Sequence, residues 1–130
     1  MADSGNDTPP KLTDIKDRAF DFAVRIVKLC KFLENHSDVS KSVCNQLLAA
    51  STSVGANLEE AVAGQSTADF IHKNAISLKE ARESNYWLRL ILATSDFDPN
   101  VRIGVMELEK ESMEIAKIVG KRIITTKRRS

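Results

Sequence analysis

The chain has few of the residues that interrupt helices and no stretch apolar enough to cross a membrane. Its 130 residues include only five glycines and three prolines, and two of the prolines are adjacent. Long stretches without either residue favour helix over sheet. The longest apolar runs are a few residues, far below the ~20 that span a bilayer, and no signal segment opens the chain. We expect a soluble, cytoplasmic, all-α protein that makes no membrane contact.

Cysteine is scarce as well. Cys30 and Cys44 are too few for a disulfide scaffold or for a zinc site of the Cys type. They lie about equally far on either side of the polar segment 35–38, so an antiparallel hairpin would place them at a similar level. Buried free thiols are the expectation for a cytosolic protein, and a disulfide between the two is the alternative.

Histidine occurs only twice, which limits the catalytic sites that the chain can build. A di-iron carboxylate bundle needs two Glu-x-x-His pairs, whereas this chain offers a single Asp69-x-x-His72. Since His36 falls in a predicted turn, no Ser or Cys nucleophile gains a convincing base, and no glycine-rich phosphate loop is present. We expect no metal, no cofactor, no small-molecule substrate and no enzymatic activity.

Charge is nearly balanced overall but uneven along the chain. The formal net charge is +1, which argues against a whole surface that binds polyanions. Two interpretations of a basic C-terminal segment remain open: its residues contact nucleic-acid phosphates, or they complement the helix dipole and solubilise the chain end. The segment has no acidic residue after position 116, and its basic residues are Lys117, Lys121, Arg122, Lys127, Arg128 and Arg129.

Apolar residues recur every three or four positions in four segments, which predicts four helices. A polar leader at 1–11 precedes the first helix, and we expect it to be disordered. The first helix has Thr13 as its predicted N-cap and ends near Glu34. A short break at 35–38 separates it from the second helix, which Gly64 closes.

The third and fourth helices carry clearer start signals. Ser66 with Asp69 resembles a capping box. Asp98 is the predicted N-cap of the fourth helix, with Pro99 at the first helical position, where its missing N–H costs nothing. The pattern of the fourth helix ends at Ile123, and the tail is expected to fray. The predicted stripe of the third helix comprises Phe70, Asn74, Leu78, Ala81, Asn85, Leu88 and Leu92.

Short connections make sequential helices antiparallel neighbours, so we predict an antiparallel up-and-down four-helix bundle over residues 12–124. Residues 125–130 would form a basic tail. The third helix is apolar nearly all round between Trp87 and Leu92, and such a helix is covered on more than one side. We therefore expect the bundle to self-associate.

Small residues fill the middle of the second helix, from Ala49 to Ala56. Gly55 costs about 1 kcal/mol relative to Ala in a helix interior. Close approach of another helix backbone, inside the bundle or between subunits, would offset that cost. A ligand cleft is the alternative.

A polar cluster is predicted where the second and third helices meet. Asn57 and Glu60 should face Lys73 and Asn74 across the turn, and we expect Asn57 and Glu60 to be buried and hydrogen-bonded. A structural role that fixes register is favoured over a binding site, and a solvated face explains the charges farther along the third helix. The cluster comprises Asn57, Glu60, Lys73, Asn74, Lys79, Glu80 and Glu83.

Three segments in combination resemble a known family. They are QLLAASTSVGANLEEA at 46–61, ADFIHK at 68–73 and ISLKEARESNYWL at 76–88. The combination is similar to the small bacterial four-helix-bundle proteins, also called 23S rRNA-intervening sequence proteins, and a looser match spans most of the chain. The resemblance implies a protomer that assembles into a ring, typically a homopentamer, with no established enzymatic activity.

The chain departs from the pattern of this family at two positions. The family often has Arg where this chain has Ala49 and Gly where it has Ala61, so an ion pair from that Arg to carboxylates of the third helix is missing. Similar proteins include the accessory proteins of diversity-generating retroelements, which bind a reverse transcriptase and nucleic acid through basic surface.

Two functions are compatible with these features. The leading hypothesis is a non-catalytic oligomeric scaffold that binds RNA, DNA or a nucleic-acid enzyme such as a reverse transcriptase through the basic C-terminal segment. The alternative is a purely structural or protein-binding homo-oligomer without a nucleic-acid role, which the small net charge supports. Aromatic residues make up only 5% of the chain, so any binding should depend on phosphates and little on base sequence.

Overall fold

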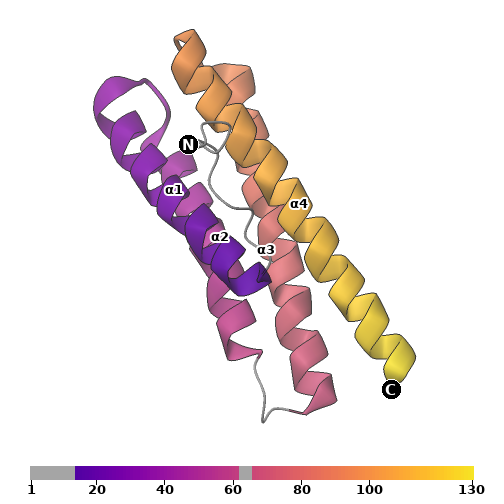
Figure 1. Ribbon diagram of the computed structural model, residues 1–130. Coiled ribbons are helices and arrows are strands. Elements are labelled where there is room, and N and C mark those ends of the chain that lie inside the picture. The colour runs from indigo at the N-terminus through magenta and orange to yellow at the C-terminus, as the bar shows by residue number, and fades with distance from the viewer. Residues whose placement is uncertain (1–13, 62–65) are drawn as a thin grey trace, which may run out of the picture.

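The computed structural model describes residues 14–61 and 66–130, and the regular structure in both ranges is helical (Figure 1). Each helix packs against two others, so that α1 contacts α2 and α4, and α3 contacts α2 and α4. Within the described ranges, no Cα atoms of the diagonal pairs α1/α3 or α2/α4 approach within 8 Å. The predicted all-α, four-helix fold is thereby confirmed. The helices are α1 (Ile15–His36), α2 (Lys41–Glu60), α3 (Thr67–Thr94) and α4 (Pro99–Arg129).

Every helix begins at a side chain that accepts a hydrogen bond from the backbone of the first turn. These N-caps are Asp14 for α1, Ser40 for α2, Ser66 for α3 and Asp98 for α4. The sequence correctly predicts the last two. For α1 the cap is Asp14, one residue after the expected Thr13, which lies outside the described residues. The four short polar side chains satisfy backbone N–H groups that have no partner inside a helix.

The break between α1 and α2 lies at 37–40, two residues later than expected. Polar side chains that suggest a turn instead bond back to helix carbonyls. Asn35 Nδ2 donates to the carbonyl of Lys31 at 3.2 Å, and Ser37 Oγ donates to the carbonyl of Leu33 at 2.8 Å. These bonds extend α1 to His36. Helix α2 ends at Glu60, and the predicted stop at residue 64 falls outside the described part of the chain.

The buried residues of α1, α2 and α4 are mostly apolar, whereas four of the seven buried residues of α3 are polar. The predicted stripe of α3 is partly wrong: Ser77, Ser84 and Ile91 are fully buried, whereas Leu78 and Leu92 are only half-buried. Hydrophobicity alone cannot identify a serine as a core residue. The largest fully buried side chains are Phe22, Ile26, Leu33, Leu47, Leu58, Leu88, Ile91, Ile115, Val54, Val105, Val119 and Asn74.

The buried serines of α3 bond to α2. Ser77 Oγ donates to the carbonyl of Val54 at 2.9 Å. Ser51 Oγ on α2 donates to Ser84 Oγ at 3.2 Å. Small hydroxyl side chains let the two backbones approach closely and leave these polar groups hydrogen-bonded, as burial requires. The serines therefore fix the register between α2 and α3.

Asn85 fixes the register between α3 and α4 in the same way. Its Nδ2 lies 2.7 Å from Glu109 Oε2, 3.1 Å from the carbonyl of Glu109 and 3.1 Å from Ser112 Oγ. Its Oδ1 accepts a bond from Arg89 Nε at 2.9 Å. Because the side chain is only 5% exposed, these bonds are made largely away from water. The amide thus ties α3 to one level of α4.

Gly55 of α2 lies beside Ala19 of α1. A Cβ atom at this position would lie 3.6 Å from Cβ of Ala19 and 3.7 Å from its carbonyl carbon. A neighbouring helix does lie beside this glycine inside the bundle, as expected, but its backbone does not come close enough to require glycine. The distances are ordinary van der Waals contacts, so a single methyl group would fit there, and a larger side chain would not.

Helix α1 is held to α4 by a two-pronged ion pair. Arg18 Nε donates to Glu111 Oε2 at 2.7 Å and Arg18 Nη2 donates to Oε1 at 2.8 Å. The two side chains are 16% and 18% exposed. The bonds to Glu111 raise the pKa of Arg18 above its usual value, against the opposing effect of burial. This geometry matches the fork of guanidinium to the two carboxylate oxygens.

We predict that Glu111→Gln destabilises the fold, because the amide keeps the shape but loses the charge that both guanidinium bonds use. The free energy of unfolding should fall by about 1.5–3 kcal/mol. Urea unfolding at one fixed protein concentration measures it. Glu114→Gln is the matched control, since its pair with Lys117 is 3.4 Å long and mostly exposed, and it should change stability by less than ~0.5 kcal/mol. Equal losses in both variants would contradict this role for the pair.

The two cysteines lie side by side at the α1–α2 hairpin, as antiparallel counting suggests. Both are buried free thiols, and Cys30 Sγ donates to the carbonyl of Cys44 at 3.8 Å. Burial, followed by the neighbouring Cys44, raises the pKa of Cys30 to about 12, and burial raises the pKa of Cys44 as well. A thiol with so high a pKa is a poor nucleophile at neutral pH.

The raised pKa of Cys30 predicts a loss of stability in alkali. The unfolded thiol loses its proton near its usual value, whereas the folded one keeps it to about pH 12, so its contribution is complete at low pH and disappears as pH rises between those values. Urea unfolding at about pH 8 and about pH 10.5 should show a drop that is on the order of 1 kcal/mol smaller in Cys30→Ala than in the parent. An identical drop in both proteins would show that this thiol does not titrate differently on folding.

Candidate nucleic-acid interface

The basic C-terminal segment is helical almost to the last residue. Helix α4 continues to Arg129, which corrects the expectation that it frays after Ile123. No glycine or proline follows Gly120, and Thr126 Oγ1 donates to the carbonyl of Arg122 at 2.8 Å. Three basic residues in the final turn also interact favourably with the negative end of the helix dipole. These residues therefore hold fixed positions on a helix.

The six predicted contact residues do not form one patch on that helix. At 3.6 residues per turn, Lys117, Lys121 and Arg128 share one outward face. Arg122 is held differently, because its guanidinium carbon lies 5.1 Å from the ring centre of Phe70 on α3. Lys117 lies 3.4 Å from Glu114 in an exposed pair. The remaining residues of the final turn, Lys127 and Arg129, are exposed on other sides of the helix.

A groove between α3 and α4 adds two arginines to this surface. One hollow of about 330 Å³ is lined by Arg82 of α3 together with Lys117 and Lys121 of α4. A second hollow of about 550 Å³ is lined by Arg82 and Arg89, beside the Asn85 network. Since Arg82 lines both, the groove carries a row of four cations from two helices. We call this row, made of Arg89, Arg82, Lys117 and Lys121, the basic groove.

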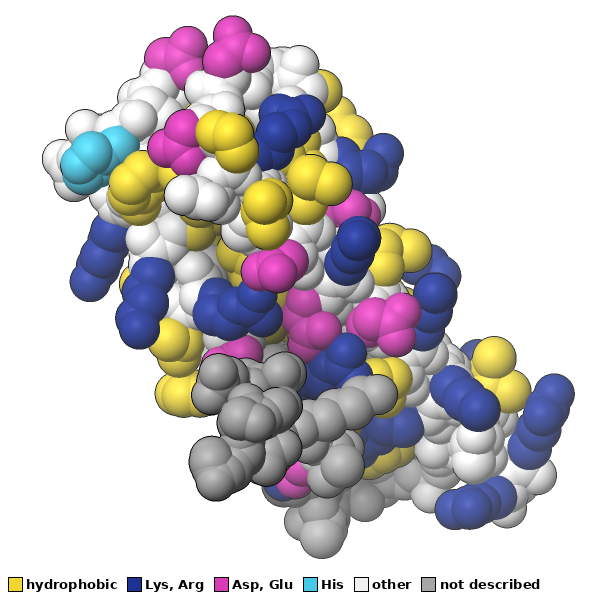
Figure 2. Space-filling view, turned by 45° about the horizontal axis from the view of Figure 1, so that its top comes forward, with side chains coloured by type: hydrophobic (Ala, Val, Ile, Leu, Met, Phe, Trp, Pro, Cys, Tyr) yellow, Lys and Arg dark blue, Asp and Glu magenta, His cyan; other side chains and the backbone are white. Residues whose placement is uncertain are grey.

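The end of the molecule that carries the last turns of α4 is visibly cationic. Figure 2 shows Lys and Arg side chains at the lower right, with no Asp or Glu drawn among them. Closer to the middle of α4 acidic side chains appear, and Glu109 lines the hollow beside Arg89. Its carboxylate accepts a bond from the neutral amide of Asn85 and keeps its negative charge, which weakens the positive potential beside Arg89. The positive surface is therefore strongest toward the C-terminal end.

The candidate nucleic-acid contacts predicted from the sequence do not include Arg82, Arg89 or Lys110. Arg89 follows Arg82 by two helical turns, and Lys110 precedes Lys117 by two turns, so each pair shares a helix face. This spacing along each helix can be recognised in the sequence. The sequence does not show how α3 packs on α4, and it is this packing that brings Arg82 to the same hollow as Lys117 and Lys121.

The predicted polar cluster is divided by the structure into separate groups. Lys73 Nζ lies 2.8 Å from Glu60 Oε1, across the connection between α2 and α3. Glu60 is 62% exposed, so the expected burial of this carboxylate is wrong. Asn57 is half-buried and bonds within its own helix, to the carbonyl of Ser53 at 2.8 Å. Only Asn74 is fully buried. Its Nδ2 bonds to the carbonyl of the residue four positions before it, and its Oδ1 finds no partner among the described residues.

The charged residues farther along α3 make no ion pair within 4.0 Å among the described side chains. Lys79 is exposed, and Glu80 and Glu83 are half-buried. Burial, followed by the charge of Glu83, raises the pKa of Glu80, while Lys79 opposes that shift. The group is a partly solvated face whose two carboxylates repel each other.

Over residues 14–61 and 66–130, no three His, Cys, Asp or Glu side chains gather closely enough to hold a metal ion. His72 is exposed on α3 and His36 stacks on Phe32 at the other end of the bundle. The searched part of the chain also contains no helix that could span a bilayer.

Comparison with known proteins places the chain in one family. The profile of the 23S rRNA-intervening sequence protein family matches residues 11–121. A solved structure from Bacteroides thetaiotaomicron VPI-5482, described as a protein with unknown function from the S23 ribosomal protein family, is 41% identical in sequence. The alignment covers 85% of this chain and 98% of that one, with a TM-score of 0.76. No curated protein matches the chain. The chain belongs to the 23S rRNA-intervening sequence protein family.

Proposed function

We propose that the protein is a non-catalytic, self-associating scaffold that binds the phosphate backbone of nucleic acid through the basic groove and the last turns of α4. The observation that carries this proposal is the row of four cations from α3 and α4. Phosphate contacts need Lys and Arg at accessible positions, and they need no base-specific geometry. The partner is RNA or DNA. A reverse transcriptase that carries nucleic acid is the alternative partner, by analogy with the retroelement accessory proteins that the chain resembles.

The charges of this surface support the proposal. Arg82, Lys121 and the basic residues of the final turn make no ion pair within 4.0 Å among the described residues. Their charges are therefore available to an external anion. The dipole at the end of α4 opposes anion binding, but its influence fades beyond the last turn. The exposed Lys117 lies several turns before Arg129, where α4 ends, and the exposed Arg82 is on α3.

Exposed apolar side chains support self-association. The all-round apolar end of α3 is largely covered within the protomer, since Leu88 and Ile91 are buried and Trp87 packs partly against the core. Large apolar residues are exposed on other parts of the surface. A homopentameric ring, which the family resemblance implies, would bury some of them and would repeat the basic groove in every subunit. Several weak phosphate contacts then add through avidity. These exposed residues are Phe20, Phe32, Tyr86, Ile103, Met106, Met113 and Ile124.

A purely structural or protein-binding homo-oligomer is the second candidate, and the net charge of +1 favours it. In that case the cations of α4 only complement the helix dipole and keep the end of the helix soluble. The compartment we propose for either function is the cytoplasm. The two functions differ in one measurable property, the affinity for a phosphate backbone.

We predict that the protein binds labelled RNA or duplex DNA weakly and with little sequence preference. Affinity should fall steeply with salt, with a log-log slope of roughly −0.9 per duplex phosphate contacted. Changing Lys121, Arg122, Lys127, Arg128 and Arg129 together to Gln should reduce affinity at least ~10-fold and flatten the slope. Arg82→Gln with Arg89→Gln should weaken binding without touching the last turns of α4. Fluorescence anisotropy at low and moderate salt measures all of these.

The control removes the same charge from another part of the surface, by changing Lys16, Lys31, Lys41, Lys79 and Arg102 to Gln. This variant should keep most of the affinity. If it binds no better than the α4 variant, net charge rather than the site governs binding. Absence of binding by the parent at low salt would eliminate the nucleic-acid role and leave the structural oligomer.

A further inference from the structure

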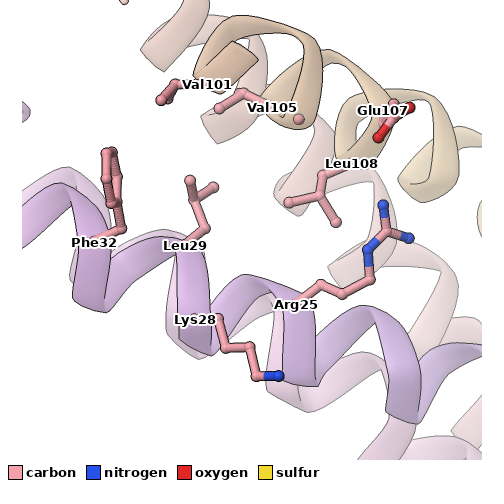
Figure 3. A pocket seen from close by; sticks show the side chains of 9 residues that line it. Arg25, Lys28, Leu29, Phe32, Val101, Val105, Glu107 and Leu108 are labelled. Carbon is pink, nitrogen blue, oxygen red and sulfur yellow. The ribbon is translucent and has the colours of Figure 1, made fainter.

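A second groove runs between α1 and α4, on the side of α4 away from the basic groove, and its walls are mainly apolar. Its volume is about 400 Å³. Figure 3 shows Leu29 and Phe32 pointing up from α1 and Val101, Val105 and Leu108 pointing toward them from α4. Phe32 is 38% exposed, and Leu29 and Val101 are half-buried, so the protomer leaves these walls partly in water. Hydrophobic side chains between the two helices are also visible in the upper part of Figure 2.

Gly104 lies on the α4 wall of this groove, and none of the described residues explains it. A Cβ atom built there meets no heavy atom within 4 Å in the described part of the chain, whereas one at Gly55 meets Ala19 and one at Gly120 meets Leu78. A glycine inside a helix costs about 1 kcal/mol relative to alanine. Glycine is used where another backbone must come close. The open space beside Gly104 therefore fits a helix from outside the protomer.

The two lips of the groove carry opposite charges without partners. Lys28 is exposed on the α1 lip and Glu107 is exposed on the α4 lip. Neither makes an ion pair within 4.0 Å among the described side chains. In Figure 3 Lys28 points away from the interior of the groove, where it could meet a charge on a neighbouring molecule. A two-fold axis through the groove would bring the basic lip of each molecule to the acidic lip of the other.

We infer that this groove docks a second copy of the chain, with α1 of the partner packing on α4 at Gly104. Ile103, which is 54% exposed, then enters the partner groove beside Phe32 and Leu29. Lys28 of each copy meets Glu107 of the other copy. Such a face is self-complementary, as a two-fold contact requires. One chain supplies the exposed Ile103 side chain, the open space beside Gly104 and both charges, Lys28 and Glu107.

This contact rests on the proposed self-association and adds a specific face to it. Neighbours in a ring of five are not related by a two-fold axis, so in such an assembly the groove joins two rings. In the absence of a ring it joins two protomers. In both cases loss of the contact halves the mass of the assembly.

The first test is Gly104→Trp, measured by light scattering coupled to size exclusion. The indole has space within the protomer, so helical content and the unfolding temperature should stay at parent values or rise, while the mass falls by half. Thr125→Trp, at an exposed position of α4 away from the groove, is the matched control and should keep the parent mass. A Gly104→Trp protein that folds and keeps the parent mass overturns the proposal.

The second test uses charge reversal and does not depend on a bulky substitution. Lys28→Glu and Glu107→Lys should each weaken the two-fold contact at least ~10-fold in Kd, because each places like charges together twice. The double variant, Lys28→Glu with Glu107→Lys, should restore the parent mass. Single variants that assemble like the parent, or a double variant that stays dissociated, contradict the contact. A parent that is itself monomeric contradicts both this contact and the proposed self-association, whereas an assembled parent with insensitive variants contradicts this contact alone.

Discussion

The arrangement of this bundle depends on the small polar residues buried along α3. Ser77 and Ser84 reach α2, and Asn85 reaches Glu109 and Ser112 on α4. Each bond is directional and its partners are backbone carbonyls or short side chains, so sliding a helix by one turn would leave buried polar groups unpaired at a cost of ~1–3 kcal/mol each. Apolar packing alone tolerates such shifts better. Helix α3 therefore fixes the positions of both of its neighbours, while α1 is attached through Ala19 at Gly55 and through the Arg18–Glu111 pair.

The different ways in which α3 and α1 are attached to the bundle determine which surfaces are available for function. Because α3 and α4 are held in one register, Arg82 and Arg89 line the same hollows as residues of α4, and the basic groove results. Because α1 is attached to α4 less extensively, an apolar groove remains open between them along Leu29 and Phe32. One groove carries charge suited to phosphates and the other carries apolar walls suited to another helix. The two faces lie on opposite sides of α4, so assembly and nucleic-acid contact need not compete.

The sequence predicts the fold well and the sites less well, for identifiable physical reasons. Helical spacing, the caps Ser66 and Asp98, and Pro99 define α3 and α4 because these signals are local. The end of α1 was misplaced because Asn35 and Ser37 bond back to the helix instead of turning the chain.

The polar cluster was overestimated, since proximity along antiparallel helices does not indicate burial, and Glu60 is exposed. Arg89 and Gly104 acquire their significance only from neighbours on another helix, or from the lack of neighbours, and periodicity within one helix carries no such information.

The large apolar side chains exposed on the protomer, such as Phe20 and Ile103, lead us to expect that the chain exists as an assembly. Light scattering coupled to size exclusion at micromolar concentration tests it most directly. The account predicts one monodisperse peak whose mass is a multiple of the 14.4 kDa protomer, and a peak at 14.4 kDa itself would contradict it.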